Sequence, residues 1–109
     1  MIRFVPFENE NLSGIKAFDG ENEAGNCTFS LDGYFMTFES VDCHDDILTE
    51  GLARAAMNYS ANRNAYIAKI SRELSSPAFL RLGFEGDEVL SVEIPEALAS
   101  GCSCGTKPF

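Results

Sequence analysis

Residues 44–70, HDDILTEGLARAAMNYSANRNAYIAKI, constrain the fold of this chain more than any other stretch. Apolar side chains recur there at the 3.6-residue spacing of a helix and form one face, made of Leu48, Leu52, Ala55, Ala56 and Tyr59. Asp45 or Asp46 is suited to cap the start of this helix, because a carboxylate accepts hydrogen bonds from free backbone amides. Residues 65–70 (AYIAKI) follow after almost no loop and predict a buried strand. The stretch therefore predicts a helix that runs directly into a strand of the core.

A second strand is predicted immediately before this helix. Residues 34–41 (YFMTFESV) are aromatic and β-branched, as in a half-buried or central strand. The resulting strand–helix–strand unit is expected to have parallel strands and a right-handed crossover. Residues 13–31 predict a β-hairpin that turns at residues 19–22 (DGEN), because Asp, Gly and Asn favour tight turns.

The C-terminal part of the chain predicts a short helix and a last strand. Ser76 is a suitable N-cap, Pro77 fits the first helical position, and Gly83 ends the helix. Residues 87–95 (DEVLSVEIP) alternate between apolar and polar side chains and predict a strand with one solvent-exposed face. A short turn is expected next, and residues 100–109 form a tail rich in cysteine and glycine.

Length and charge limit the classes of protein that remain. A single domain covering residues 1–109 is expected from the length. The net charge of −9 argues against non-specific binding to nucleic acid or anionic membranes, which requires a field of Lys and Arg. No apolar run approaches the roughly 20 residues that cross a bilayer, and the first residues lack the plan of a signal peptide. A cytoplasmic protein is expected, with neither nucleic acid nor a membrane as its partner.

From about Gly14 to Ile94, the order of these elements resembles the core of the GCN5-related N-acetyltransferase (GNAT) family. Residues 38–41 (FESV) resemble the family's central strand, and residues 50–70 resemble the helix and strand that follow its cofactor loop. Residues 78–84 (AFLRLGF) resemble the family's F/Y-x-x-x-G-F helix end. The resemblance implies an α+β domain with a mixed, mostly antiparallel central sheet and two main helices.

In that family, the loop between the central strand and the helix binds the pyrophosphate of acetyl-coenzyme A through backbone amides. The resemblance assigns this role to the backbone of Ile47, Leu48, Thr49, Glu50, Gly51 and Leu52, and it implies that Val41 and Cys43 align the thioester through strand-like hydrogen bonds. The family pattern, Arg/Gln-x-x-Gly-x-Gly/Ala, is degraded here, because Gly51 alone matches a glycine and no Arg or Gln precedes it. Asp45, Asp46 and Glu50 bring negative charge toward the phosphates, so acetyl-coenzyme A is a candidate cofactor that we expect to bind poorly.

Two further departures concern the rest of the implied active site. Many family members place an acidic tyrosine where this chain has Phe79, which has no proton to give. The family also has two helices between its first and second strands, whereas residues 6–13 (PFENENLS) leave no room for them. The absence of this helix pair would leave part of the domain uncovered, so we expect a homodimer that buries it.

The candidate reactive side chains have alternative interpretations. His44, the single histidine, is either a catalytic base at the end of the central strand or a polar loop residue. A zinc-type site would use the four cysteines of the chain, which are Cys27, Cys43, Cys102 and Cys104. Alternatively, Cys27 and Cys43 are small buried hydrophobic residues, and the pair in the tail is redox-active.

Two functions from different classes follow. The first is a non-catalytic or weakly active GNAT-like module that forms complexes with a partner. The second is an acetyl-coenzyme A-dependent N-acetyltransferase that acts on a small amine or a peptide, with His44 or a water as the base. The degraded loop, Phe79 and the missing helix pair favour the first function.

Overall fold

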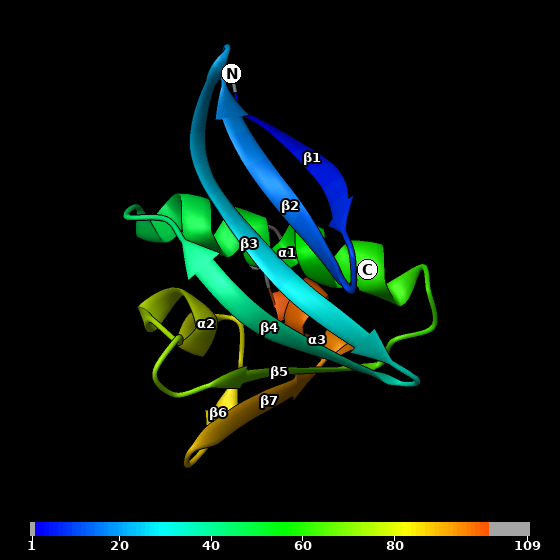
Figure 1. The fold of residues 1–109 in the computed structure, drawn as a ribbon. Coiled ribbons are helices and arrows are strands. Elements are labelled where there is room, and N and C mark those ends of the chain that lie inside the picture. The colour runs from blue at the N-terminus through cyan, green and yellow to red at the C-terminus, as the bar shows by residue number, and fades with distance from the viewer. Residues whose placement is uncertain (1, 101–109) are drawn as a thin grey trace.

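The computed structural model describes residues 2–100, which form a seven-stranded sheet with three helices on one of its faces (Figure 1). The elements follow along the chain as β1 (Ile2–Asn9), β2 (Leu12–Asp19), β3 (Asn22–Asp32), β4 (Phe35–Asp42), α1 (Asp46–Ala61), β5 (Ile67–Ser71), α2 (Pro77–Arg81), β6 (Glu85–Gly86), β7 (Val89–Glu93) and α3 (Ile94–Ser100). Within residues 2–100, no helix is both long and apolar enough to cross a membrane.

The middle of the sheet confirms the predicted strand–helix–strand unit. The strands lie in the order β1-β2-β3-β4-β5-β7-β6. β4 and β5 pair in parallel through residues 35–37 and 67–69, whereas the other neighbouring strands are antiparallel. α1 crosses behind β2 and β3 in Figure 1 and contacts both strands. The sheet is therefore mixed and mostly antiparallel, as the sequence predicts.

The buried face of α1 differs from the face that the spacing of apolar residues predicts. Its buried side chains are Thr49, Leu52, Ala53, Ala56, Met57 and Ser60. Leu48, Ala55 and Tyr59 lie only partly buried at the edge of the core. The Ser60 hydroxyl donates a hydrogen bond to the Ala56 carbonyl oxygen at 2.8 Å, which satisfies this polar group inside the core. The helix can therefore turn its small and hydroxylated side chains toward the sheet.

Aromatic rings join the helices to the centre of the sheet. The Phe38 ring of β4 lies edge-on to Phe79 of α2, with 5.3 Å between the centroids, and to Phe84 at 6.3 Å. Phe29 of β3 makes the same type of contact with Phe38 at 6.2 Å and with Tyr59 of α1 at 5.7 Å. Such pairs contribute about 0.5–1.5 kcal/mol each beyond the burial of their area. The cluster fixes α1 and α2 on the same face of the sheet.

The structure corrects the sequence predictions at both ends of the described chain. The sequence predicts no strand before residue 13, but β1 forms the edge of the sheet, where Pro6 is tolerated because one side of the strand has no ladder partner. The segment expected as a short turn lies in α3. Ile94 and Ala97 anchor that helix in the core, and the Ile94 N–H donates to the Tyr66 carbonyl oxygen at 2.8 Å.

The sheet face opposite the helices carries polar side chains in its middle, on β3 and the end of β4. β1 and β2 are joined by a tight turn in place of the family's helix pair, as expected from the sequence. Thr28 and Ser30 alternate with buried residues of β3, so they point away from α1. The Thr28 and Ser40 hydroxyls lie 2.6 Å apart, and the Ser30 hydroxyl donates to the Glu39 carboxylate at 3.0 Å. This face therefore tolerates solvent without a covering layer, and it lends no support to the expected homodimer.

Gly51 is expected to be required by the Phe4 ring of β1. A Cβ built at Gly51 would lie 2.6 Å from the Cζ of this ring. Gly51→Ala should therefore stabilise the protein by up to about 1 kcal/mol, the gain in helix propensity, only when Phe4 is also replaced by Ala. In the native background the new methyl displaces the ring and the gain is lost. Urea unfolding of both single variants and the double variant checks this prediction, and additive effects would contradict it.

Candidate functional site

The candidate site lies at the junction where β4 ends and α1 begins. β4 pairs with β5 only over residues 35–37, so residues 38–42 extend beyond the parallel pair. Residues 43–45 connect the strand to α1, which starts at Asp46. This is the junction at which the resemblance places the phosphate-binding amides.

The carboxylate of Asp45 occupies the amides at the start of α1. Its Oδ1 accepts a hydrogen bond from the backbone N–H of Ile47 at 2.8 Å and another from that of Leu48 at 3.1 Å. The Asp45 backbone is extended, with φ −108° and ψ 121°, as expected of an N-cap. Its carbonyl oxygen accepts the first helical hydrogen bond, from the Thr49 N–H at 2.8 Å. Donors that could hold an external anion are therefore bonded to an anion of the chain itself.

Arg81, at the end of α2, reaches the first turns of α1. Its Nε donates to Glu50 Oε1 at 3.2 Å, and its Nη1 lies 3.8 Å from Asp46 Oδ2. Arg54 pairs with Glu50 from the following turn, with 2.5 Å between Nη2 and Oε2. Sequence reasoning missed Arg81, because it lies 31 residues from Glu50 and no local pattern predicts that contact. Two arginines thus offset part of the negative charge at the junction.

The first four residues predicted to bind the cofactor flank the junction. Val41 and Cys43 come from the end of β4 and its connection, and Ile47 and Leu48 lie in the first turn of α1. The Ile47 side chain is 82% exposed, whereas Val41, Cys43 and Leu48 pack against the core. These four residues lie where the resemblance places them, and their binding to a cofactor stays a prediction.

Residues 49–52 have other structural roles. Their amides lie within α1, in which each N–H donates to the carbonyl four residues before it. The Thr49 and Leu52 side chains are buried in the core. The Phe4 ring packs against Gly51, which is the single match to the family's glycines. Packing accounts for Gly51 without any cofactor.

The two cysteines within residues 2–100 are both free thiols. Burial raises the pKa of the Cys27 thiol to about 12, so this thiol stays protonated and behaves as a small hydrophobic residue. The Cys43 thiol donates to the Asp45 carbonyl oxygen at 3.5 Å. A Cβ at Gly25 would lie 3.0 Å from its Sγ, so Cys43 packs closely over β3.

The predicted metal site and catalytic histidine gain no partners from the described chain. Within residues 2–100, no three His, Cys, Asp or Glu side chains are grouped to hold a metal ion. Cys102 and Cys104 lie outside the described residues. His44 is exposed in the connection after β4, and its role as a base stays a prediction.

Two tyrosine hydroxyls that could replace the family's catalytic acid form hydrogen bonds elsewhere, away from the junction of β4 and α1. Phe79 is buried in the aromatic cluster. The Tyr59 hydroxyl, at the far end of α1, donates to the Glu8 carboxylate at 3.0 Å. The Tyr66 hydroxyl, before β5, donates to Glu93 at 3.3 Å. Neither of these two hydroxyls lies at the position of Phe79 in α2, where the resemblance places the family's acid.

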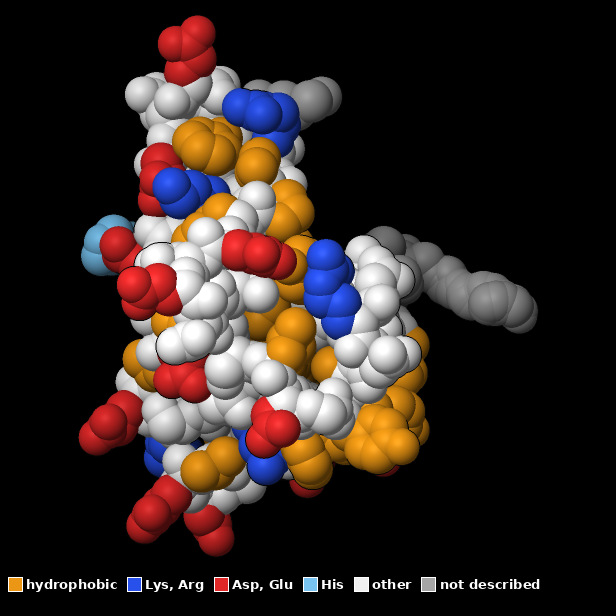
Figure 2. All heavy atoms as spheres, turned by 45° about the vertical axis from the view of Figure 1, so that its right-hand side comes forward, with side chains coloured by type: hydrophobic (Ala, Val, Ile, Leu, Met, Phe, Trp, Pro, Cys, Tyr) orange, Lys and Arg blue, Asp and Glu red, His pale blue; other side chains and the backbone are white. Residues whose placement is uncertain are grey.

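Charged side chains are intermixed on the face that Figure 2 presents. Acidic groups are spread over the whole height of this face, and basic groups lie between them without joining into a continuous patch. The expectation that nucleic acid is not a partner rests on the net charge of −9 and stays a prediction.

Glu50 is expected to contribute to the pH dependence of stability. The hydrogen bond from Arg54, followed by that from Arg81, holds the pKa of this carboxyl below its ordinary value of 4.5. A lowered pKa in the folded state adds stability that is present above pH 4.5 and is lost as the pH falls through the folded-state pKa. Glu50→Gln should therefore flatten the acid limb of the curve of unfolding free energy against pH. Glu88→Gln, at an exposed position of the β6–β7 turn, is the control, and equal slopes in both variants would contradict the prediction.

Comparisons with known proteins give structural matches only, because neither a family model nor a curated protein matches the sequence. The ribosomal-protein-S18-alanine N-acetyltransferase of Escherichia coli superposes with a TM-score of 0.65 at 11% identity, covering 80% of this chain and 72% of that chain. The E. coli GNAT-family N-acetyltransferase YhbS, in complex with coenzyme A, has a TM-score of 0.61 at 18% identity, covering 79% and 61%. The PaiA N-acetyltransferase of Thermoplasma acidophilum, also with coenzyme A, has a TM-score of 0.62 at 12% identity, covering 73% and 59%. This chain therefore has the fold of the GNAT acetyltransferases.

Proposed function

We propose that this chain is a non-catalytic GNAT-fold module in which the start of α1 no longer accepts the pyrophosphate of coenzyme A. The observation that carries the proposal is the double hydrogen bond from the Ile47 and Leu48 amides to the Asp45 carboxylate. A diphosphate would have to displace this carboxylate from the amides and leave it close by, without its hydrogen bonds. The group that the fold implies therefore does not fit the residues at this junction.

Electrostatic repulsion adds to this competition. A phosphate charge about 5 Å from a carboxylate costs on the order of 3 kcal/mol at an effective dielectric constant near 20, before screening by salt. Asp45, Asp46 and Glu50 all approach the start of α1, and Arg54 and Arg81 offset part of their charge. Both arginines are already paired with carboxylates, so neither is free to act as a dedicated phosphate ligand.

The alternative function is an acetyl-coenzyme A-dependent N-acetyltransferase acting on a small amine or a peptide. The likeness of fold supports it, since two of the structural neighbours were determined with coenzyme A. Fold alone does not carry an activity. That chemistry requires groups that transfer protons. Because Phe79 stands where the family has a tyrosine, the candidates in this chain are exposed His44 and a water.

Titration with acetyl-coenzyme A, followed by amide shifts of ¹⁵N-labelled protein, separates the two functions. We expect no saturable shifts at residues 46–48 up to about 1 mM cofactor, a concentration at which binding near −4 kcal/mol would be visible. The double variant Asp45→Arg with Asp46→Gly should gain affinity, because it frees the amides and reverses the local charge. Asp32→Arg with Asp87→Gly, at acids outside the junction, is the matched control for net charge. Saturable shifts at residues 46–48 in the native protein would overturn the proposal.

A homodimer remains part of this proposal, through a surface other than the polar sheet face. Ile2, Phe4 and Ile47 are exposed around an apolar hollow of about 310 Å³ between β1 and the start of α1. Sedimentation velocity at tens of micromolar should detect a dimer, and Ile47→Ser should shift it toward monomer. A native protein that sediments as a monomer would contradict this expectation.

A further inference from the structure

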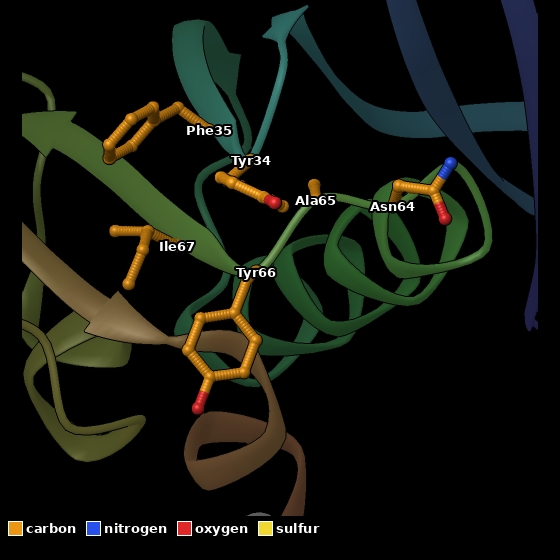
Figure 3. A pocket seen from close by; sticks show the side chains of 6 residues that line it. All are labelled: Tyr34, Phe35, Asn64, Ala65, Tyr66 and Ile67. Atoms are coloured by element: carbon orange, nitrogen blue, oxygen red, sulfur yellow. The ribbon is translucent and has the colours of Figure 1, made fainter.

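An aromatic hollow lies at the end of the sheet where the β3–β4 turn meets the connection from α1 to β5. Its volume is about 800 Å³. Figure 3 shows the residues that line it, which are Tyr34, Phe35, Asn64, Ala65, Tyr66 and Ile67. The junction of β4 and α1 lies at the other end of β4, so this hollow is a separate site.

The walls of the hollow are fixed by backbone hydrogen bonds. The Tyr34 carbonyl oxygen accepts from the Tyr66 N–H at 2.6 Å and from the Ile67 N–H at 2.9 Å. Tyr66 is also tied to α3, because its carbonyl oxygen accepts from the Ile94 N–H. In spite of this rigid frame, the Tyr34 side chain is 70% exposed and that of Tyr66 is 47% exposed. The backbone that carries these two rings is thus fixed at the surface, so little backbone ordering is left to be done on binding.

Carboxylates lie next to the hollow on the side of Tyr66. The Tyr66 hydroxyl donates to the Glu93 carboxylate, and the ring of Tyr66 extends toward α3, as Figure 3 shows. The charges of Glu93 and, more weakly, Glu96 raise the pKa of the Tyr66 hydroxyl, which places both carboxylates within electrostatic reach of this ring. Carboxylates beside an exposed aromatic ring attract a cation.

One ring of the hollow already binds an ammonium group of the chain itself. The Lys69 Nζ lies 4.1 Å from the centroid of the Phe35 ring. Arg63, the other nearby cation, lies over the Tyr59 ring at 3.6 Å. Within residues 2–100, neither Tyr34 nor Tyr66 has a cation or a second ring over its face. The two tyrosine rings therefore remain open to an external cation.

We propose that this hollow docks a lysine-bearing segment of a partner protein, with the ammonium group near the Tyr66 ring and the Glu93 carboxylate, and with Tyr34 lining the same hollow. The alkyl stem of the lysine would lie against the apolar surface of Ala65 and Ile67. This inference supplies the partner chemistry for the proposed module, but it does not depend on the closed start of α1.

A matched pair of peptides tests the proposal on the full chain. The peptide acetyl-Gly-Lys-Gly-Lys-Gly-amide should cause saturable ¹⁵N amide shifts at Tyr34 and at residues 64–67, and added salt should weaken them. The same peptide with norleucine in place of lysine keeps the alkyl stem without the charge, and it should leave these amides unchanged. Tyr34→Ala and Glu93→Gln should each weaken binding about two- to fivefold. Leu80→Ala, an exposed apolar position on α2, is the control and should bind as the native protein does.

Three results would overturn the inference. The lysine peptide could leave the amides of the hollow unmoved, or the norleucine peptide could bind equally well. These amides could also shift with protein concentration in the absence of peptide, which would identify a second copy of this chain as the occupant. Because cofactor binding is monitored at residues 46–48, failure of this inference and failure of the proposed function give different signatures in the same spectra.

Discussion

The hydrogen bonds between the Asp45 carboxylate and the Ile47 and Leu48 amides define the start of α1, on which the rest of the structure depends. A helix that begins there presents Leu52 and Met57 to the sheet and places Glu50 within reach of Arg81 from α2. The same bonds decide the chemistry of the junction, because a helix start satisfied from within has fewer donors to offer a phosphate. The start of the helix and the proposed loss of an anion site thus depend on the same side chain.

The polar outer face of the sheet explains how the domain can do without the helix pair that this fold usually has. The hydroxyls of Thr28 and Ser40 bond to each other, and Ser30 bonds to Glu39, so this part of the outer face is compatible with water. The apolar residues of β3 are directed instead to the side of α1. A tight β1–β2 turn can therefore replace two helices without exposing the core.

Periodicity and turn residues predicted the elements from residue 13 to residue 93 except β6, and they limited the N-cap of α1 to Asp45 or Asp46, because those signals are local. They did not predict β1, whose edge position tolerates Pro6, or α3, which is anchored by Ile94 packing in the core. The family resemblance located the junction, but its one matching glycine, Gly51, is accounted for by the ring of Phe4. Arg81 and the hollow around Tyr34 required the tertiary structure, since their contacts join segments distant in sequence.

The short parallel pairing of β4 with β5 also has a mechanical consequence. The four-stranded meander β1–β4 meets the three-stranded remainder along a seam only three residues deep on each strand. Beyond that seam, the Phe38 ring of the meander packs against the Phe79 and Phe84 rings of the other part. The two parts of the sheet are thus joined by packed aromatic edges as well as by backbone hydrogen bonds, and the aromatic part of their cohesion depends on temperature as the hydrophobic effect does.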